Sequence, residues 1–387
     1  MNGNLRRVAL VYPVPIPYTF PVLRRIFSTG EVDLTVFYAR HALAGREPLR
    51  DDAELDFPHH FLPDRGRVRV RGNVQEIDFN PTLPRELERR RVSLVVVSGF
   101  VQPTALLGIG WARIRRRRYA IMSESHGLRS RSVPRRVLRR TLGGPLVRGA
   151  AVLYPTGRLA AAELRGLGGL EERSVLFPHV PDPALFHVEG RDAARAMLRR
   201  AVAAAGEEPI AIYVGRLVES KGVKTLLAAH RHVHATTGAQ LAVVGGGPLT
   251  GLLRSTAPPG VSFLGPRRPA EVAELLRGAD LAVVPSLDEP WGTVVLEALV
   301  SGCPVVASDR VAAAVEVLPA FEAGELVPAG DVERLAGMLA ELLADGARRA
   351  RLGAGAARAA AAYTPERAAA AFLEGVRIAF ASEGAAR

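Results

Sequence analysis

Lysine is almost absent from this sequence. The chain of 387 residues carries 51 Lys and Arg residues, and only Lys221 and Lys224 among them are lysines. The chain uses arginine for nearly every positive charge, yet it keeps two lysines in one short segment. This pattern indicates a position that needs a compact ammonium group instead of a planar guanidinium. We expect Lys221, at the start of a predicted helix, to be that position and Lys224 to be a surface residue.

Cysteine, long apolar runs and aromatic residues are also scarce, and each shortage excludes a class of protein. The single cysteine, Cys303, excludes an internal disulfide and fits a reducing cytoplasm. No run of about 18 apolar residues occurs, which disfavours a membrane-spanning helix. Aromatic residues make up 6% of the chain. Stacking on nucleic-acid bases is therefore poorly supported, and a basic nucleic-acid-binding protein remains a disfavoured alternative.

Positive charge is concentrated in one half of the chain. Residues 1–187 hold 30 Arg against 17 acidic residues, whereas residues 188–387 hold 21 Lys and Arg against 22 acidic residues. This asymmetry and the length favour two domains. The basic region Arg113–Arg140 is a candidate surface for an anionic partner, such as the inner face of a membrane or a phosphate-bearing acceptor. A merely solvated basic face is the alternative.

Short apolar runs alternate with helical patterns along the whole chain. Continuous apolar strands of this kind are typical of parallel sheets covered by helices on both faces. We therefore expect an α/β protein with doubly wound parallel sheets and a final amphipathic helix over residues 364–381. The predicted strands are residues 8–12, 34–38, 94–98, 119–123, 151–155, 210–215, 241–245, 281–285 and 304–308.

The segment "VGRLVESKG" predicts a strand, a glycine turn and a helix. Such a unit points backbone N–H groups at a ligand's phosphates. Arg216 at the strand end and Lys221 at the helix start can both face the crevice at the carboxyl ends of the strands. A guanidinium forks onto two phosphate oxygens, whereas an ammonium is a point charge that fits between two phosphates. If this segment is considered without the other motifs, the alternative is that Arg216 and Lys221 are an ordinary pair of solvated cations.

Three consecutive glycines, Gly245, Gly246 and Gly247, follow the next strand. They allow a ligand to approach the backbone closely, although a plain tight turn would use them too. The spacing is not G-x-G-x-x-G, and the first strand of the chain runs into "VYPVPIPY" without a glycine. A nicotinamide-dinucleotide site is therefore disfavoured.

The stretch "PSLDEPWGTVVLEALVSGCPVVASD" carries two glutamates around a predicted helix start near Gly292. Glu289 lies just before the helix and Glu297 lies inside it. At the rise of a helix the two carboxylates stand roughly 10 Å apart, too far to share one proton. The spacing suits two contacts to two parts of one long ligand, with chance as the alternative.

Together, "GRLVESKG", "GGGPL" and the glutamate stretch resemble, in order and spacing, the retaining nucleotide-sugar glycosyltransferases of family 4, which have the GT-B fold. The similarity covers most of residues 205–310. It implies two Rossmann-like domains that face each other across a cleft. The acceptor-binding domain would span residues 1–185, the donor-binding domain residues 186–363, and a helix in residues 364–387 would cross back to the first domain.

The resemblance also implies residue roles. Arg216 and Lys221 would hold the donor diphosphate, Glu289 the hydroxyls of the transferred sugar, and Glu297 the nucleotide ribose. His126 follows a strand where the family often has a histidine near the sugar; a structural histidine is the alternative. Further implied donor-binding residues are Gly215, Gly245, Gly246, Gly247, Pro248, Pro290, Trp291, Gly292 and Thr293.

The implied activity is a metal-independent, retaining transfer of a sugar from a nucleotide-sugar donor, with no cofactor. No Asp-x-Asp pair stands where a diphosphate could use it, so Arg216 and Lys221 would take the place of a metal. The acceptor would be a bacterial envelope lipid, a polysaccharide or a natural-product small molecule. A GT-B epimerase or hydrolase is the enzymatic alternative. The loop "YPVPIPYTFP" and His179 depart from the pattern of the family, which commonly has a glycine pair and an asparagine there.

Overall fold

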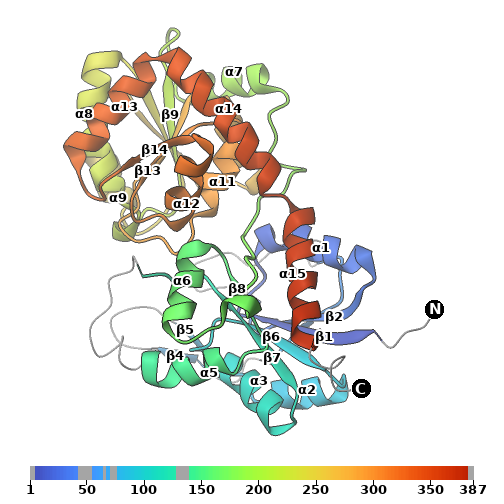
Figure 1. Ribbon diagram of the computed structural model, residues 1–387. Coiled ribbons are helices and arrows are strands. Elements are labelled where there is room, and N and C mark those ends of the chain that lie inside the picture. The colour runs from blue at the N-terminus through green and yellow to red at the C-terminus, as the bar shows by residue number, and fades with distance from the viewer. Residues whose placement is uncertain (1–4, 42–54, 64–66, 70–75, 128–138, 382–387) are drawn as a thin grey trace. The chain divides into compact units, whose positions relative to one another are not determined.

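The computed structural model describes residues 5–41, 55–63, 67–69, 76–127 and 139–381 (Figure 1). The chain forms two compact units. Unit 1 comprises Met1–His179 together with Pro365–Arg387, and unit 2 comprises Val180–Thr364. No helix among these described residues is long and apolar enough to cross a bilayer.

Unit 1 is built on a six-stranded parallel sheet with the strand order β3-β2-β1-β6-β7-β8. The order reverses between β1 and β6, as in doubly wound folds. Residues 67–69 and 76–78 form a separate antiparallel pair, β4 and β5. The strands are β1 (Arg6–Tyr12), β2 (Val32–Tyr38), β3 (His59–Phe61), β4 (Arg67–Arg69), β5 (Glu76–Asp78), β6 (Leu94–Ser98), β7 (Arg118–Ser123) and β8 (Val152–Pro155).

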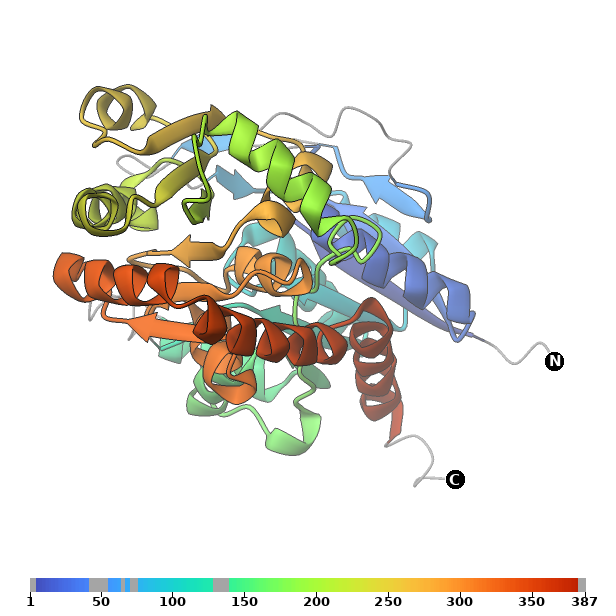
Figure 2. The ribbon, with the colours of Figure 1, turned by 90° about the horizontal axis from the view of Figure 1, so that it is seen from above.

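Helices cover both faces of this sheet. On one face, α2 and α3 pack onto alternate strand residues such as Val95 and Ile121. On the other, α1 packs against α15, the last helix of the chain (Figure 1 and Figure 2). The Tyr154 hydroxyl of β8 donates to the Phe372 carbonyl of α15 at 2.7 Å. The helices are α1 (Phe20–Thr29), α2 (Leu83–Arg89), α3 (Pro103–Ile114), α5 (Gly144–Arg148), α6 (Arg158–Gly166) and α15 (Pro365–Phe380), and short turns form η1 (Pro17–Thr19), η3 (Arg139–Gly143) and η4 (Glu171–Arg173).

Unit 2 repeats the plan with the strand order β11-β10-β9-β12-β13-β14, all parallel. The order reverses between β9 and β12. The strands are β9 (Ile210–Val214), β10 (Gln240–Val244), β11 (Val261–Gly265), β12 (Leu281–Val284), β13 (Val305–Ser308) and β14 (Gly324–Val327). The helices are α7 (Arg191–Ala201), α8 (Val223–Thr237), α9 (Thr250–Ser255), α10 (Pro269–Gly278), α11 (Thr293–Val300), α12 (Ala312–Phe321), α13 (Val332–Ala344) and α14 (Gly346–Ala362), with the turn η5 (Glu219–Lys221).

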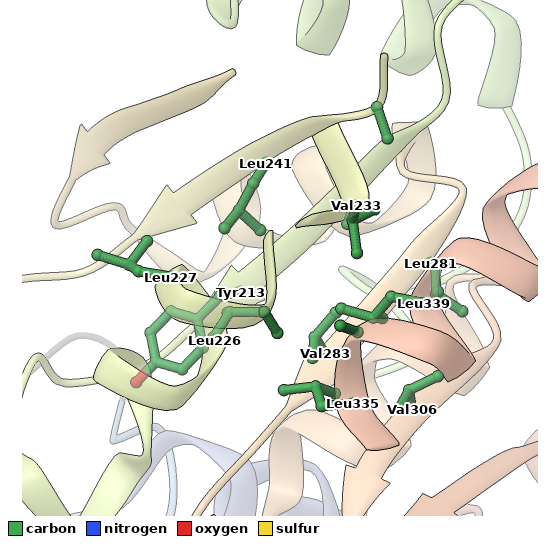
Figure 3. Close-up of a cluster of buried hydrophobic side chains, with 14 of the residues drawn as sticks. Tyr213, Leu226, Leu227, Val233, Leu241, Leu281, Val283, Val306, Leu335 and Leu339 are labelled. Carbon is green, nitrogen blue, oxygen red and sulfur yellow. The ribbon is translucent and has the colours of Figure 1, made fainter. Parts of the chain in front are cut away.

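The core of unit 2 lies between its sheet and the helices α8 and α13 (Figure 3). Leu226 and Val233 of α8 and Leu339 of α13 are fully buried there against Leu241 and Val283 of the sheet. Each large aliphatic side chain buried in this way contributes about 1.5–3 kcal/mol. This packing fixes the strand ends on which the loops of the site stand.

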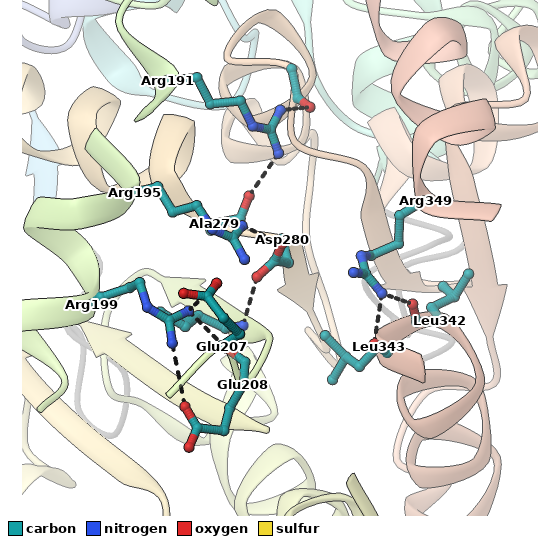
Figure 4. Close-up of polar contacts among 12 residues, drawn as sticks. Arg191, Arg195, Arg199, Glu207, Glu208, Ala279, Asp280, Leu342, Leu343 and Arg349 are labelled. Carbon is teal, nitrogen blue, oxygen red and sulfur yellow. Dashed lines mark hydrogen bonds and ion pairs between the residues drawn. The ribbon is translucent and has the colours of Figure 1, made fainter. Parts of the chain in front are cut away.

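Three arginines of helix α7 hold this helix against the rest of unit 2 (Figure 4). Arg191 donates to the carbonyl oxygens of Gly302 at 3.0 Å and Ala279 at 3.2 Å. Arg195 pairs with Asp280 at 2.6 Å, and the second oxygen of Asp280 accepts from the Ile210 backbone N–H at 2.8 Å. Asp280 is thus a buried charge that is paired and hydrogen-bonded, which buried charges require.

All nine predicted strands form, and the expected α/β class with doubly wound parallel sheets is confirmed. The strands β3, β4, β5, β11 and β14 were not predicted. Of these, β3, β11 and β14 are edge strands of the six-stranded sheets, and their residues are mostly only partly buried. Edge strands need fewer apolar residues, so they leave no continuous apolar run in the sequence. The predicted final helix is present as α15.

Candidate functional site

The candidate site lies at the carboxyl edge of the unit 2 sheet, where the strand order reverses. The loops that follow β9 and β12 meet there, which is where open α/β sheets bind ligands. The Leu287 backbone N–H donates to the Ser220 carbonyl at 2.8 Å, and the Leu217 N–H donates to the Gly246 carbonyl at 2.9 Å. The loops after β9, β10 and β12 are thereby joined into one surface.

Glycines allow these loops to approach so closely. Gly222 has φ of 66°, and a Cβ there would collide with the Pro285 carbonyl oxygen. A Cβ on Gly245 would collide with the Gly215 carbonyl oxygen. The glycine triplet after β10 therefore has a packing role inside unit 2, in addition to any contact with a ligand. Pro248 follows the triplet in an exposed turn before α9.

Lys221 and Glu289 form an ion pair between the loops after β9 and β12. Their side chains are 22% and 12% exposed, so the pair is shielded but reachable from solvent. The backbone N–H of Glu289 donates to the Arg310 carbonyl at 3.2 Å, which holds the acidic loop against the end of β13. Sequence reasoning had assigned the two side chains to different parts of a ligand and did not predict that they touch each other.

Arg216 lies in the same loop after β9 as Lys221 and is exposed. Among the described residues it makes neither an ion pair nor a side-chain hydrogen bond, while its carbonyl accepts from the Tyr213 hydroxyl at 2.8 Å. Its backbone is thus fixed and its guanidinium is available. Lys224 is exposed and pairs with Glu219 at 2.5 Å, as expected of a surface residue.

Helix α11 begins beside the acidic loop. Gly292, with φ of 93°, precedes Thr293, and a Cβ on Gly292 would lie 2.7 Å from Val311 Cγ1. Trp291 is buried, and its carbonyl accepts from the Ala313 N–H at 2.9 Å. Pro290 is partly buried between Glu289 and Trp291. The first turn of α11 therefore has a fixed position at the edge of the sheet, and the first N–H groups of a helix, which lack partners within the helix, favour an anion there.

Glu297 lies in the second turn of α11. Its side chain forms no hydrogen bond with a described residue, and burial raises the pKa of its carboxyl from 4.5 to about 7. A carboxyl group with a raised pKa that hydrogen-bonds to none of the described residues is a group that a ligand hydroxyl can satisfy.

Unit 1 places a second group of side chains at the carboxyl edge of its own sheet. Just after β7, Glu124 Oε1 lies 2.8 Å from His179 Nε2, and His126 is 1% exposed. The Tyr18 ring, in the proline-rich loop after β1, lies 4.6 Å from the His179 ring. The two departures from the family pattern, the proline-rich loop and His179, thus contact each other. Sequence reasoning missed Glu124, whose only signal was its place directly after a strand.

In the expected basic surface Arg113–Arg140, part of the region is not described and some of the described arginines are paired with acidic residues. Residues 128–138, including Arg135 and Arg136, lie outside the described residues. Arg139 pairs with Glu163 at 2.8 Å and stacks on Phe100 at 4.6 Å, so it is not a solvated charge. Arg115 pairs with Glu88 at 2.5 Å. Within the described part of the chain, no three His, Cys, Asp or Glu residues are grouped so that they could hold a metal ion.

Comparison with known proteins concerns the family and the fold of this chain. Residues 195–359 match the family profile described as glycosyl transferases group 1, and this segment contains Arg216, Lys221, Glu289 and Glu297. A D-inositol 3-phosphate glycosyltransferase of Rhodococcus opacus is 35% identical over 202 residues, which is 49% of this chain and 44% of that protein. The match thus spans less than half the length of that relative.

A second relative extends the similarity through both units. The GDP-mannose-dependent alpha-(1-6)-phosphatidylinositol monomannoside mannosyltransferase of Mycobacterium tuberculosis is 29% identical over 331 residues, 80% of this chain and 78% of that protein. In structure, sucrose-phosphate synthase from Thermosynechococcus elongatus has a TM-score of 0.73 at 22% identity, covering 97% of this chain and 100% of that one. Residues 195–359 thus match the glycosyl transferases group 1 family, and the structural similarity shows that the chain has the GT-B fold.

Proposed function

We propose that this protein is a retaining glycosyltransferase that moves a sugar from a nucleoside-diphosphate donor to an acceptor hydroxyl. The observation that carries the proposal is the convergence of Lys221, Glu289 and the exposed Arg216 at the switch point of the unit 2 sheet. Two cations beside the N-terminus of a helix can bind a diphosphate, and an adjacent carboxylate can accept hydrogen bonds from sugar hydroxyls.

In the reaction, the bond between the anomeric carbon and the donor phosphate oxygen breaks. Negative charge develops on the departing diphosphate, and Arg216, Lys221 and the first turn of α11 stabilise it. The acceptor oxygen forms its bond to the anomeric carbon on the same face, and its proton passes to the leaving phosphate oxygen. The sugar configuration is retained and no charge is left unbalanced.

The other proposed contacts with the substrate come from residues in the loops and in α11. Glu289 would accept hydrogen bonds from sugar hydroxyls once the donor diphosphate competes for Lys221. Glu297 would contact the ribose, because its partly protonated carboxyl can both donate and accept. The glycine loops around Gly215 and Gly245, with Pro248, Pro290 and Thr293, would border the donor. We propose that His126 of unit 1 contacts the transferred sugar, as the resemblance implies.

We propose that unit 2 binds the donor and unit 1 the acceptor. The relatives are named for an inositol phosphate and for a phosphatidylinositol mannoside, so a hydroxyl-rich acceptor on a bacterial envelope lipid is the first candidate. Polysaccharide precursors and natural-product small molecules are the other acceptors to test. A lipid acceptor would bring the protein to the cytoplasmic face of the membrane. Arg113 and the 81% exposed Ile114 are side chains in the described part of the basic region that could touch it.

The proposal is tested by incubating the protein with a panel of nucleotide sugars, with and without polyol and inositol-lipid acceptors. We expect slow release of nucleoside diphosphate from one donor, faster release with the right acceptor, and a product with the donor's anomeric configuration. We expect EDTA to leave the rate unchanged, because Arg216 and Lys221 supply the positive charge. Turnover without any release of nucleoside diphosphate would favour an epimerase and refute the transferase.

A further inference from the structure

A group of arginines in unit 1 lies at the amino edge of its sheet, the edge away from the strand ends that carry Glu124 and His126. β1 begins at Arg6 and β7 at Arg118. The Ser93 N–H, just before β6, donates to the Arg7 carbonyl at 2.9 Å, and the Arg118 N–H donates to the Ser93 carbonyl at 3.2 Å. Three neighbouring strands thus start side by side, and the outer two, β1 and β7, start at an arginine.

A cavity of about 300 Å³ opens at this edge. Its basic lining residues are Arg6, Arg7, Arg91, Arg116, Arg117 and Arg118, and none of the described lining residues is acidic. A neighbouring cavity of about 590 Å³ shares Arg7 and Arg91 and adds Arg89 and Arg90, with Asp33 as its acidic residue. Concentrating guanidinium groups around a concave space raises the local potential and attracts anions.

Two of these arginines are held by stacking. The guanidinium carbons of Arg6 and Arg118 lie 4.4 Å and 4.7 Å from the centre of the Phe380 ring, at the end of α15. A stacked guanidinium keeps its N–H donors around its edge, in the plane where they can reach an oxyanion. The aromatic ring therefore positions the two cations at the cavity instead of neutralising them.

Two others occupy backbone positions that favour glycine. Arg91 has φ of 52° and Arg116 has φ of 53°, each in the left-handed region just after the end of a helix, α2 and α3 respectively. Glycine or asparagine is usual there, and a larger side chain is strained. The side chains of Arg91, Arg116 and Arg117 make no ion pair or hydrogen bond with the described residues. Helix termination does not need arginine at these two positions, whereas an anion site does.

We propose that this cavity is a binding site for a phosphate-bearing ligand, separate from the donor site in unit 2. Guanidinium forks bind phosphate oxygens in pairs, and a volume of about 300 Å³ accommodates one phosphorylated group. The same chemistry is offered by a free phosphate compound and by the headgroup of a phospholipid. The proposal does not depend on the glycosyltransferase assignment.

The test uses pyrophosphate as the probe and calorimetry on the full-length protein. Arg216→Ala/Lys221→Ala first removes the proposed donor cations of unit 2. In that background we expect pyrophosphate to bind still, and Arg91→Asn/Arg116→Asn to weaken binding at least tenfold. Asparagine tolerates the left-handed conformation, so the thermal midpoint of the Asn variant should equal or exceed that of its parent. Arg25→Gln/Arg173→Gln, which removes the same charge from exposed positions of unit 1, is the matched control and should bind like the parent.

Pyrophosphate binding that is unchanged in Arg91→Asn/Arg116→Asn, or absent in the Arg216→Ala/Lys221→Ala background, would overturn the proposal. Equal weakening by the Arg25/Arg173 control would do the same, because net charge alone would then explain it. Co-sedimentation with phosphatidic acid vesicles identifies the source of the phosphate. Vesicle binding that Arg91→Asn/Arg116→Asn abolishes assigns the site to a lipid headgroup, and pyrophosphate binding without vesicle binding assigns it to a free phosphate compound.

Discussion

Lys221 of the loop after β9 and Glu289 of the loop after β12 form an ion pair at the point where the strand order of unit 2 reverses. Without a ligand, each side chain satisfies the other. A donor diphosphate would offer Lys221 a partner of higher charge and leave Glu289 to accept hydrogen bonds from the sugar. Donor binding and the positioning of Glu289 are therefore linked through one contact.

Replacement of Lys221 by arginine should lower turnover although the charge is kept. The wider, planar guanidinium cannot take the place of a compact ammonium between Glu289 and the diphosphate. We expect a loss of roughly 100-fold in kcat/KM, the range seen when one electrostatic donor is misplaced. The matched control is Lys224→Arg, at the exposed pair with Glu219, which should turn over like the wild type. Equal rates for the two variants would show that Lys221 is incidental.

The two glutamates of the acidic stretch should have separate effects. Glu289→Ala should lower turnover more than it weakens binding of the free nucleoside diphosphate, because its proposed contacts are to the sugar. Glu297→Ala should weaken nucleotide binding more than it lowers turnover at saturation, because its proposed contact is to the ribose. Binding by calorimetry and turnover from the same preparations decide the matter. Wild-type behaviour of both variants would remove both residues from the site.

Glu297 should also make the stability of the protein depend on pH. Its carboxyl has a pKa of about 7 in the folded protein and 4.5 without burial, so folding favours the protonated form. Stability should fall as pH rises through this window and level off above it. Glu297→Gln, which resembles the protonated acid, should raise the thermal midpoint by several degrees at pH 8 and by little at pH 5. An identical difference at both pH values would contradict the shift.

Cys303 should be unreactive in the folded protein. It is fully buried between α11 and β13, and burial raises the pKa of its thiol to about 12. Because the thiolate is the reactive form, a disulfide reagent at pH 8 should leave the native protein unlabelled and label one thiol per chain after denaturation. Rapid, complete labelling under native conditions would show that this part of unit 2 opens readily.

The sequence predicted the central strands and the final helix well, because their apolar runs reflect burial on both faces. Edge strands such as β11 and β14 escaped prediction because their partly exposed residues form no such run. Among the site residues, Arg216, Lys221 and Glu289 were marked by motif, but the direct contact between Lys221 and Glu289 depends on the sheet order. Strand order is a long-range property that local pattern does not contain.

The features found only in the structure are of the same long-range kind. Glu124 and His179 are 55 residues apart in sequence. They meet because Glu124 directly follows β7, and the chain passes this strand end again at His179, just before it enters unit 2. Arg91 and Arg116 read in the sequence as ordinary members of arginine runs. Only their backbone conformation and their shared cavity distinguish them.

The most direct test of the donor site is a comparison of nucleoside diphosphates with the matching monophosphates in equilibrium binding to the wild type and to Arg216→Ala/Lys221→Ala. The site proposed here recognises the diphosphate. The wild type should therefore bind one diphosphate at least about 100-fold more tightly than its monophosphate, a difference of about 2.7 kcal/mol. The double variant should lose that preference. Equal binding of the two nucleotides by the wild type, or an undiminished preference in the double variant, would contradict the account.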